Sequence, residues 1–206
     1  MSRQSNTESR RAQIVAALLA VIGREGYGKA TIQAIAREAG LAPGLIHYHF
    51  RSKQEILVSL VESLAQAART RFAAVLQDGD GPARPLERLR AYLHARLGLG
   101  DGAAPEIVAA WVMIGAEAVR QPEVREVYRT MVAAELELLR TLLADALRER
   151  GRRTDGVEAL AAGLVAMIEG AFQLSSAAAD AMPRGYAAQA ATRYAEWAID
   201  AAPAAR

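Results

Sequence analysis

The sequence predicts an all-α protein of about nine helices. Alanine is abundant along the 206 residues, and only 5% of them are aromatic, a composition that favours helix over sheet. Apolar residues recur three and four positions apart, and no stretch of useful length alternates as a strand would. We therefore expect two helical domains, residues 9–55 and residues 56–206, connected by a helix over 52–77.

Composition and charge narrow the function classes. The chain has no cysteine, which excludes disulfides, thiolate metal sites and a cysteine nucleophile, and we predict no metal and no cofactor. Residues 1–77 carry 10 Lys and Arg against 5 Asp and Glu, whereas residues 78–206 carry 15 against 18. A basic end on a mildly acidic body suits contact with phosphates at that end. No stretch approaches the length of a membrane span and the N-terminus lacks a signal-peptide core, so we expect a cytoplasmic protein with no membrane partner.

The N-terminal residues 1–8 are polar, and we expect them to form a mobile tail. Arg3, Arg10 and Arg11 give this end a basic edge, which is either solvated or in contact with phosphates. A first amphipathic helix follows over 9–24, and Gly26 and Gly28 close it. Its apolar stripe consists of Ile14, Ala17, Leu18, Val21 and Ile22.

The stretch from Thr31 to Lys53 predicts two short helices joined by a tight turn. Thr31 is a good N-cap for the first helix, and Gly40 supplies the left-handed residue that a helix end needs. Pro43 suits the first position of the second helix. Ser52 and Glu55 then form a capping box that starts the long helix over 52–77.

The second of these short helices has two different faces. Ile46, His49 and Phe50 share one side, and we expect His49 to pack in the core. The opposite side is small at its start and hydrogen-bonding at its middle, with Pro43, Gly44, His47 and Tyr48 outward and Leu45 on the flank. A helix after a tight turn with such a face is suited to the major groove of DNA.

The rest of the chain predicts five more helices. Two loops interrupt it, a Gly-, Asp- and Pro-rich break at 77–82 and a glycine-rich loop at 98–102. We expect the helices at 86–97, 106–120, 124–150, 155–179 and 185–201. The helix at 155–179 is apolar on two faces and so needs two partners, its own domain and a second copy of the chain. We expect the dimer interface to comprise Gly163, Met167, Gly170, Leu174, Tyr194 and Trp197.

Residues 10–58 resemble the TetR (tetracycline-repressor-like) family of bacterial regulators. The motif that carries the resemblance is Thr31, Ala34-Ile35-Ala36, Ala39-Gly40-Leu41, Gly44, Ile46, Tyr48-His49-Phe50, Ser52-Lys53 and Leu57. The C-terminal part resembles the subgroup that includes the choline-responsive repressor, through Trp111, Ala116, Pro122 and Tyr128. The resemblance implies a three-helix DNA-binding head, a C-terminal domain with a small-molecule cavity, and a homodimer made through the last two helices.

The resemblance also implies roles for individual residues. Thr31 and Lys53 would hold phosphates, and Ala42 stands where the family usually has Ser or Thr, so a side-chain cap is lost there. The DNA-binding set is Thr31, Ala42, Pro43, Gly44, Leu45, His47, Tyr48 and Lys53. Ligand-binding candidates, which could equally be core, are Trp111, Met113, Glu117, Tyr128, Met167 and Phe172. Glu117 either pairs with Arg120 or Arg125 or receives a cationic ligand.

We therefore predict a dimeric, sequence-specific DNA-binding transcriptional regulator, a repressor released from a palindromic operator by a small-molecule effector. The alternative is a constitutive or architectural DNA-binding protein whose C-terminal domain only dimerises. An enzyme is disfavoured, because three histidines, no glycine-rich phosphate loop and no clustered acids leave little catalytic chemistry.

Overall fold

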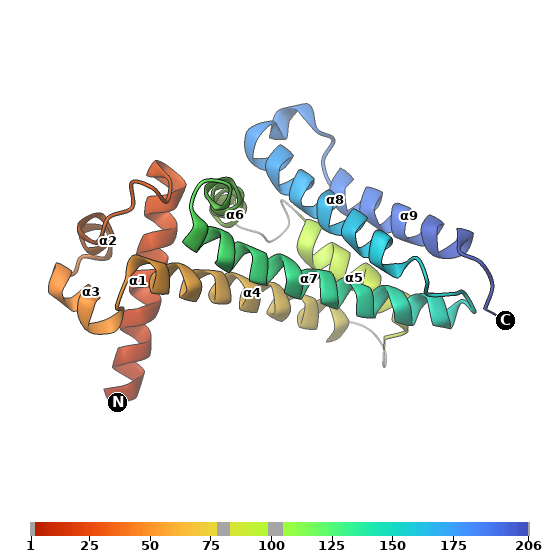
Figure 1. Cartoon of the computed structure of the whole chain (residues 1–206), viewed down its shortest axis with the longest axis horizontal. Coiled ribbons are helices and arrows are strands. Elements are labelled where there is room, and N and C mark those ends of the chain that lie inside the picture. Colours follow the sequence, from red (N-terminus) through yellow and green to blue (C-terminus); the bar gives the residue numbers. More distant parts are fainter. Residues whose placement is uncertain (1–2, 78–82, 99–104, 206) are drawn as a thin grey trace. The chain divides into compact units, whose positions relative to one another are not determined.

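The computed structural model describes residues 3–77, 83–98 and 105–205, and the fold in these ranges is all-α, as predicted (Figure 1). Of the breaks predicted at 77–82 and 98–102, all but their first residues lie outside the described residues. Within them, β pairing is limited to an isolated bridge between Arg152 and Ala204. The described helices are α1 (Arg3–Glu25), α2 (Ile32–Ala39), α3 (Pro43–His49), α4 (Lys53–Gln77), α5 (Pro85–Leu97), α6 (Pro105–Ala118), α7 (Pro122–Glu149), α8 (Val157–Ala177), a 3₁₀ turn η1 (Ala179–Ala181) and α9 (Tyr186–Ala201).

The chain divides into two compact units. The head unit contains residues 1–66 and 106–129, and the body unit contains residues 67–105 and 130–206. Helices α4 and α7 therefore each contribute to both units, and α6 packs with the head. The predicted boundary at 55–56 separates a DNA-binding domain from a ligand-binding and dimerisation domain, and it stays a prediction.

Helix α1 begins earlier than the sequence suggested. The tail expected over residues 1–8 is helical from Arg3 onward, because residues 3–8 contain neither Gly nor Pro to stop the helix. Its predicted stripe forms the middle of the head core, with Ile14, Leu18 and Ile22 fully buried. Burying each such side chain contributes about 1.5–3 kcal/mol, which holds α2 and α3 against α1.

Local signals set the turn between α2 and α3 as predicted. The Thr31 hydroxyl accepts a hydrogen bond from the Ala34 N–H at 3.1 Å and caps α2. Gly40 has φ 64° and ends α2 in the left-handed region, and the Leu41 N–H donates back to the Ala36 carbonyl at 2.9 Å. Pro43 is the first residue of α3. The chain therefore reverses between two helices while the carbonyls of Ala36 and Arg37 stay hydrogen-bonded.

The start of α4 differs slightly from the predicted capping box. The Glu55 N–H donates to the Ser52 hydroxyl at 3.1 Å, as expected. The Glu55 carboxylate instead accepts from the N–H of Arg51, one residue earlier than the box requires, at 2.8 Å. The acid thus stabilises the loop that leads from α3 into α4.

Helix α8 packs against α5 and α9 in the body unit. Its residues Leu164, Ile168 and Phe172 are buried there. The 21 residues of α8, with mean hydropathy 1.5, are long and apolar enough to cross a membrane, so the expectation that no stretch approaches the length of a membrane span is wrong. The core helix of a soluble protein can have the same length and composition.

Candidate nucleic-acid interface

Helix α3 presents the two faces that its sequence predicts. Ile46 is fully buried and Phe50, just after the helix, is 2% exposed, so one side anchors α3 in the head core. Gly44, His47 and Tyr48 are exposed, and Tyr48 is the most exposed large apolar residue among those described, at 78%. A Cβ built on Gly44 would meet no atom within 4 Å, so the chain's own packing does not require glycine there. His49 is half-buried rather than packed in the core.

The remaining residues of the predicted set surround α3. Pro43 and Ala42 are exposed, and Leu45 is half-buried on the flank. Ala42 is the N-cap of α3 and makes no side-chain hydrogen bond, in agreement with the lost cap. Thr31 is exposed beside the N-terminus of α2, with its hydroxyl used as the cap. The structure brings these residues together on the head unit, and their contacts to DNA remain predictions.

Lys53 has a partner that the sequence did not reveal. Its Nζ donates to the Tyr27 carbonyl at 3.0 Å and lies 4.1 Å from the centroid of the Tyr27 ring. Burial lowers the pKa of Lys53, and the carboxylates of Glu123 and Glu117 oppose that shift. A phosphate at this position would therefore have to share the ammonium with the α1–α2 loop.

Tyr27 and Gly28 also connect that loop to α6. Burial, followed by the charges of Glu123 and Glu117, raises the pKa of Tyr27 to about 12. The Glu117 carboxylate lies 3.3 Å from where a Cβ on Gly28 would be, and it accepts a hydrogen bond from Gln121 at 2.8 Å. The side chain at position 117 thus belongs to the contact between α6 and the loop.

The pairing expected for Glu117 is not the one observed. Arg125 donates to the backbone carbonyls of Ala118 and Val119, at 2.9 and 2.8 Å, and so caps the end of α6. The Glu117 carboxylate accepts its hydrogen bond from Gln121 and not from Arg120 or Arg125. The reason is local: the helix end offers unpaired carbonyls, which attract the nearby guanidinium.

The other ligand candidates fall into both units. In the head unit, Trp111 is buried and its ring lies 6.0 Å from that of Tyr128, tilted by 45°. Met113 contacts the loop instead, with its Cε 3.6 Å from a Cβ built on Gly26. Met167 and Phe172 belong to the body unit, where Phe172 is buried and Met167 half-buried. The candidates of the head unit and those of the body unit thus pack within different units. The ligand-binding site predicted from all of them stays a prediction.

The body unit contains a polar cluster that sequence reasoning missed. The Arg96 guanidinium makes two hydrogen bonds to the Glu135 carboxylate, at 2.7 and 3.0 Å, and the Tyr92 hydroxyl donates to the same carboxylate at 2.7 Å. Arg96 also lies 5.1 Å above the Phe172 ring, and the Phe72 ring meets Tyr92 edge to face at 5.5 Å. The side chains of Arg96 and Glu135 are only 14% and 9% exposed. Burial, reinforced by Glu135, raises the pKa of Tyr92 far above its usual range, so its hydroxyl stays a donor.

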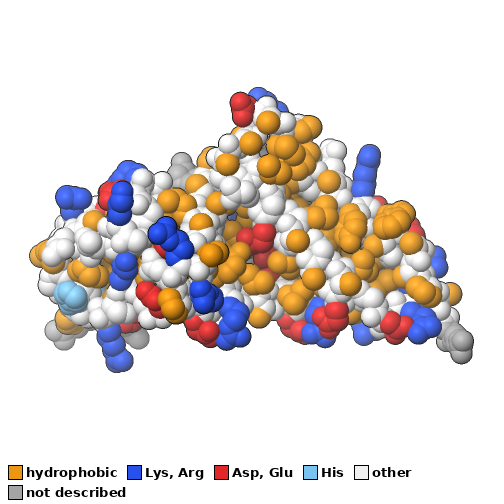
Figure 2. All heavy atoms as spheres, turned by 45° about the horizontal axis from the view of Figure 1, so that its top comes forward, with side chains coloured by type: hydrophobic (Ala, Val, Ile, Leu, Met, Phe, Trp, Pro, Cys, Tyr) orange, Lys and Arg blue, Asp and Glu red, His pale blue; other side chains and the backbone are white. Residues whose placement is uncertain are grey.

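The residues predicted for the dimer interface separate into two kinds. Gly163 has an internal neighbour, because the Tyr194 hydroxyl of α9 lies 3.1 Å from where its Cβ would be. Gly170 is exposed with no atom within 4 Å of that position, and Leu174 and Trp197 are exposed to 39% and 69%. Figure 2 shows hydrophobic side chains gathered over the surface that α8 and α9 form.

A capped α2, a left-handed glycine turn and an α3 with one buried and one exposed face define a helix-turn-helix DNA-binding protein. Residues 14–60 match the family model of bacterial regulatory proteins, tetR family, and residues 85–200 match that of the BetI-type transcriptional repressor, C-terminal. The chain belongs to the TetR family of transcriptional regulators and has a BetI-type C-terminal domain.

Individual relatives agree with this assignment. The chain is 36% identical over 163 residues to the HTH-type transcriptional regulator BetI of Rhizobium meliloti, covering 79% of this chain and 76% of the relative. It is 35% identical over 163 residues to BetI of Agrobacterium fabrum, covering 79% and 75%. The predicted regulatory function is confirmed over the architectural alternative and over an enzyme.

Solved structures show the same fold. A transcriptional regulator from Pseudomonas aeruginosa PAO1 superimposes with a TM-score of 0.77 at 21% identity, covering 94% of this chain and 92% of that one. A regulator from Saccharomonospora viridis, solved in complex with choline, gives a TM-score of 0.71 at 24% identity and covers 97% and 100%.

Proposed function

We propose that the protein is a homodimeric repressor that binds a palindromic operator through α3 and releases it on binding a small quaternary ammonium compound such as choline. The observation that carries the DNA-binding part is the exposed row of Gly44, His47 and Tyr48 on a helix anchored by Ile46 and Phe50. A repressor of this kind acts on the chromosome, and we place it in the cytoplasm.

On this proposal, some residues around α3 contact bases and others contact phosphates. Pro43, Gly44 and Leu45 meet base edges, with Gly44 allowing close approach, while His47 and Tyr48 reach phosphates or bases. Thr31 offers backbone N–H groups at the start of α2, where a helix N-terminus favours a phosphate.

The homodimer is proposed from the exposed surface of α8 and α9. Gly170 leaves room for a close helix approach, and exposed Leu174 and Trp197 supply apolar area that a partner would cover. A two-fold pair would present two α3 helices to successive major grooves, about 34 Å apart. The operator would then be palindromic because the two copies are equivalent.

The effector class is proposed from aromatic and acidic side chains together with the choline complex of the Saccharomonospora viridis regulator. Quaternary ammonium groups are recognised by aromatic faces and a nearby carboxylate. In the body unit the guanidinium of Arg96, a cation, lies over the Phe172 ring and is paired with Glu135, which also accepts from the Tyr92 hydroxyl. The Phe72 ring packs edge to face against Tyr92. In the head unit the Trp111–Tyr128 pair supplies two further aromatic faces.

Release of the operator follows if the effector prefers one arrangement of the protein. A ligand changes an equilibrium only by its difference in affinity for the two states, and about 5.5 kcal/mol moves a population from 1:99 to 99:1. Because α4 and α7 each belong to both units, either helix can connect the effector to the head.

The test begins with an operator selected by the wild-type chain from random duplexes. Choline should release that operator in a gel shift, whereas 3,3-dimethyl-1-butanol, its uncharged isostere, should not, because aromatic faces attract the positive charge. Phe172→Leu should weaken the choline response and leave operator binding without choline intact. Equal responses to choline and its isostere would refute the cation class.

A further inference from the structure

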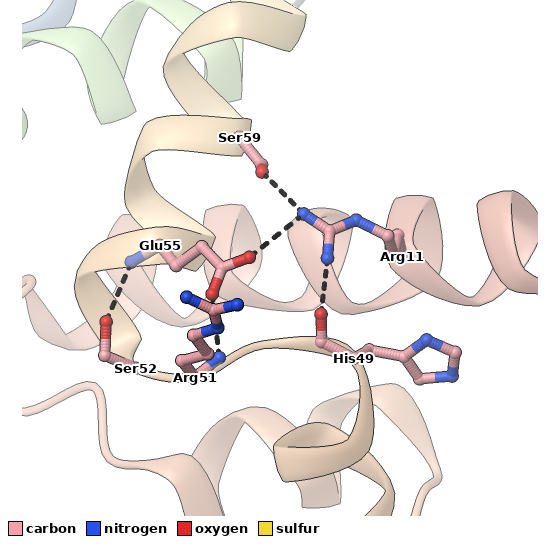
Figure 3. A network of polar contacts seen from close by, with 6 residues as sticks. All are labelled: Arg11, His49, Arg51, Ser52, Glu55 and Ser59. Carbon is pink, nitrogen blue, oxygen red and sulfur yellow. Dashed lines mark hydrogen bonds and ion pairs between the residues drawn. The ribbon is translucent and has the colours of Figure 1, made fainter.

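Arg11 and Arg10 are neighbours on α1, yet their side chains have different surroundings. Arg10 is exposed and donates to Gln13, one turn along the same helix, at 2.8 Å. Arg11 is half-buried, and its guanidinium points toward the end of α3 and the start of α4 (Figure 3). The sequence placed both on one basic edge, and the structure separates them.

The first contact of Arg11 is with the end of α3. Its Nη1 donates to the backbone carbonyl of His49, the last residue of that helix. A carbonyl in the last turn has no partner inside the helix, and a positive charge there complements the helix dipole. The guanidinium carbon also lies 3.9 Å from the centroid of the Phe50 ring, so Arg11 covers the residue that anchors α3 in the core.

The second contact of Arg11 is with α4. Its Nη2 lies 3.5 Å from the Glu55 carboxylate and 3.4 Å from the Ser59 hydroxyl. Glu55 in turn accepts from the Arg51 N–H, so the loop between α3 and α4 joins the same network (Figure 3). One planar guanidinium thus connects α1, the end of α3 and the first turns of α4.

We infer that Arg11 is a positioning residue, which sets the placement of α3 on the head and thereby determines which base pairs that helix reads. The inference rests on the proposed function, in which α3 is the DNA-reading helix. Arg11 does not act by neutralising a phosphate, because its donors are directed to His49, Glu55 and Ser59. Base-edge contacts require side chains at fixed places in the groove. A shift of α3 therefore lowers the affinity for the operator more than the affinity for random DNA.

The decisive variant is Arg11→Lys, which keeps the charge and loses the planar fork. A single ammonium cannot reach the carbonyl of α3 and both groups of α4 with the same geometry. The readout is the ratio of affinities for a selected operator and for a random duplex, measured at several salt concentrations beside circular dichroism. Partial unfolding lowers both affinities equally and leaves this ratio unchanged.

We expect Arg11→Lys to lower the ratio by about tenfold, the size of losing one base-pair contact, with the salt slope on random DNA unchanged. Arg10→Gln is the matched control and should leave the ratio as in the wild type, whether or not it touches a phosphate. Glu55→Gln keeps an acceptor for the Arg51 N–H and should lower the ratio in the same direction by a smaller factor. It provides the test if Arg11→Lys does not fold.

Two results would overturn the inference alone. One is an unchanged ratio in Arg11→Lys, or in Glu55→Gln if the first variant is unfolded. The other is an equal loss on both DNAs with a salt slope reduced by about one unit, which would make Arg11 a phosphate ligand. A wild-type chain that selects no preferred sequence would instead overturn the proposed function together with the inference that rests on it.

Discussion

The exposed surface of α3 and that of α8 and α9 both carry large apolar side chains, and the surroundings of those side chains differ. On α3 the exposed Tyr48 stands beside Gly44 and His47, in the part of the sequence with excess positive charge. On α8 and α9 the exposed Leu174 and Trp197 stand in helices rich in alanine, and α8 also contains Gly163 and Gly170. The exposure of an apolar side chain therefore does not by itself indicate which partner binds there. The neighbouring side chains indicate it, because hydrogen-bonding and basic neighbours suit DNA whereas small apolar neighbours suit another helix.

Of the substitutions considered, Gly170→Leu should have the largest effect on operator binding, through loss of the dimer. The new side chain meets nothing in its own chain but would obstruct a closely packed partner helix. Operator affinity should fall by about a hundredfold or more as the two half-sites lose their linkage, although the site lies far from α3 in the sequence. Sedimentation should show a folded monomer, and an intact dimer with normal affinity would place the interface on other helices.

Gly163→Leu is the matched control for that variant. Its side chain would collide with the Tyr194 hydroxyl inside the same chain, so it should lower the thermal stability of the folded chain itself. Comparing the two variants therefore distinguishes Gly170, which we expect to pack against the second copy of the chain, from Gly163, which packs within the body unit.

Leu45→Ala should alter operator preference by about tenfold at one base pair while leaving binding to random DNA nearly intact. Leu45 lies on the flank of α3, half-buried, where it can reach a base edge without holding the fold. Selection from random duplexes with each protein measures the change. Identical selected sequences would remove Leu45 from the reading surface.

Lys53→Ala should weaken binding to operator and random DNA alike, and the salt slope should decrease by about one unit. The change also removes the hydrogen bond to the Tyr27 carbonyl, so thermal unfolding is measured in parallel. Arg24→Ala is a suitable control, because Arg24 is paired with Glu38 at 2.7 Å on the head. A slope equal to that of the wild type would exclude the phosphate contact.

The smallest effect concerns His47. His47 is exposed on α3, where its imidazole can hydrogen-bond a phosphate or a base edge. His47→Ala should lower operator affinity by less than about tenfold, while sedimentation of the two proteins should be the same. Equal operator affinities for the variant and the wild type would remove His47 from the DNA-binding surface.

Features that depend on residues close together in the chain could be predicted from the sequence alone. Thr31, Gly40 and Pro43 act through their own dihedral angles and caps, so the helix-turn-helix could be predicted from them. The periodicity of Ile14, Leu18 and Ile22 likewise showed which face of α1 is buried.

The polar contacts between helices could not be predicted from the sequence, because they join residues that are far apart in the chain and meet only in the folded protein. Arg11 meets His49 across 38 positions, Lys53 meets Tyr27 across 26, and Arg96 meets Glu135 across 39. No local propensity distinguishes Arg11 from Arg10. Adjacent residues on a helix point in different directions, so packing turned one guanidinium into the head and left the other at the surface.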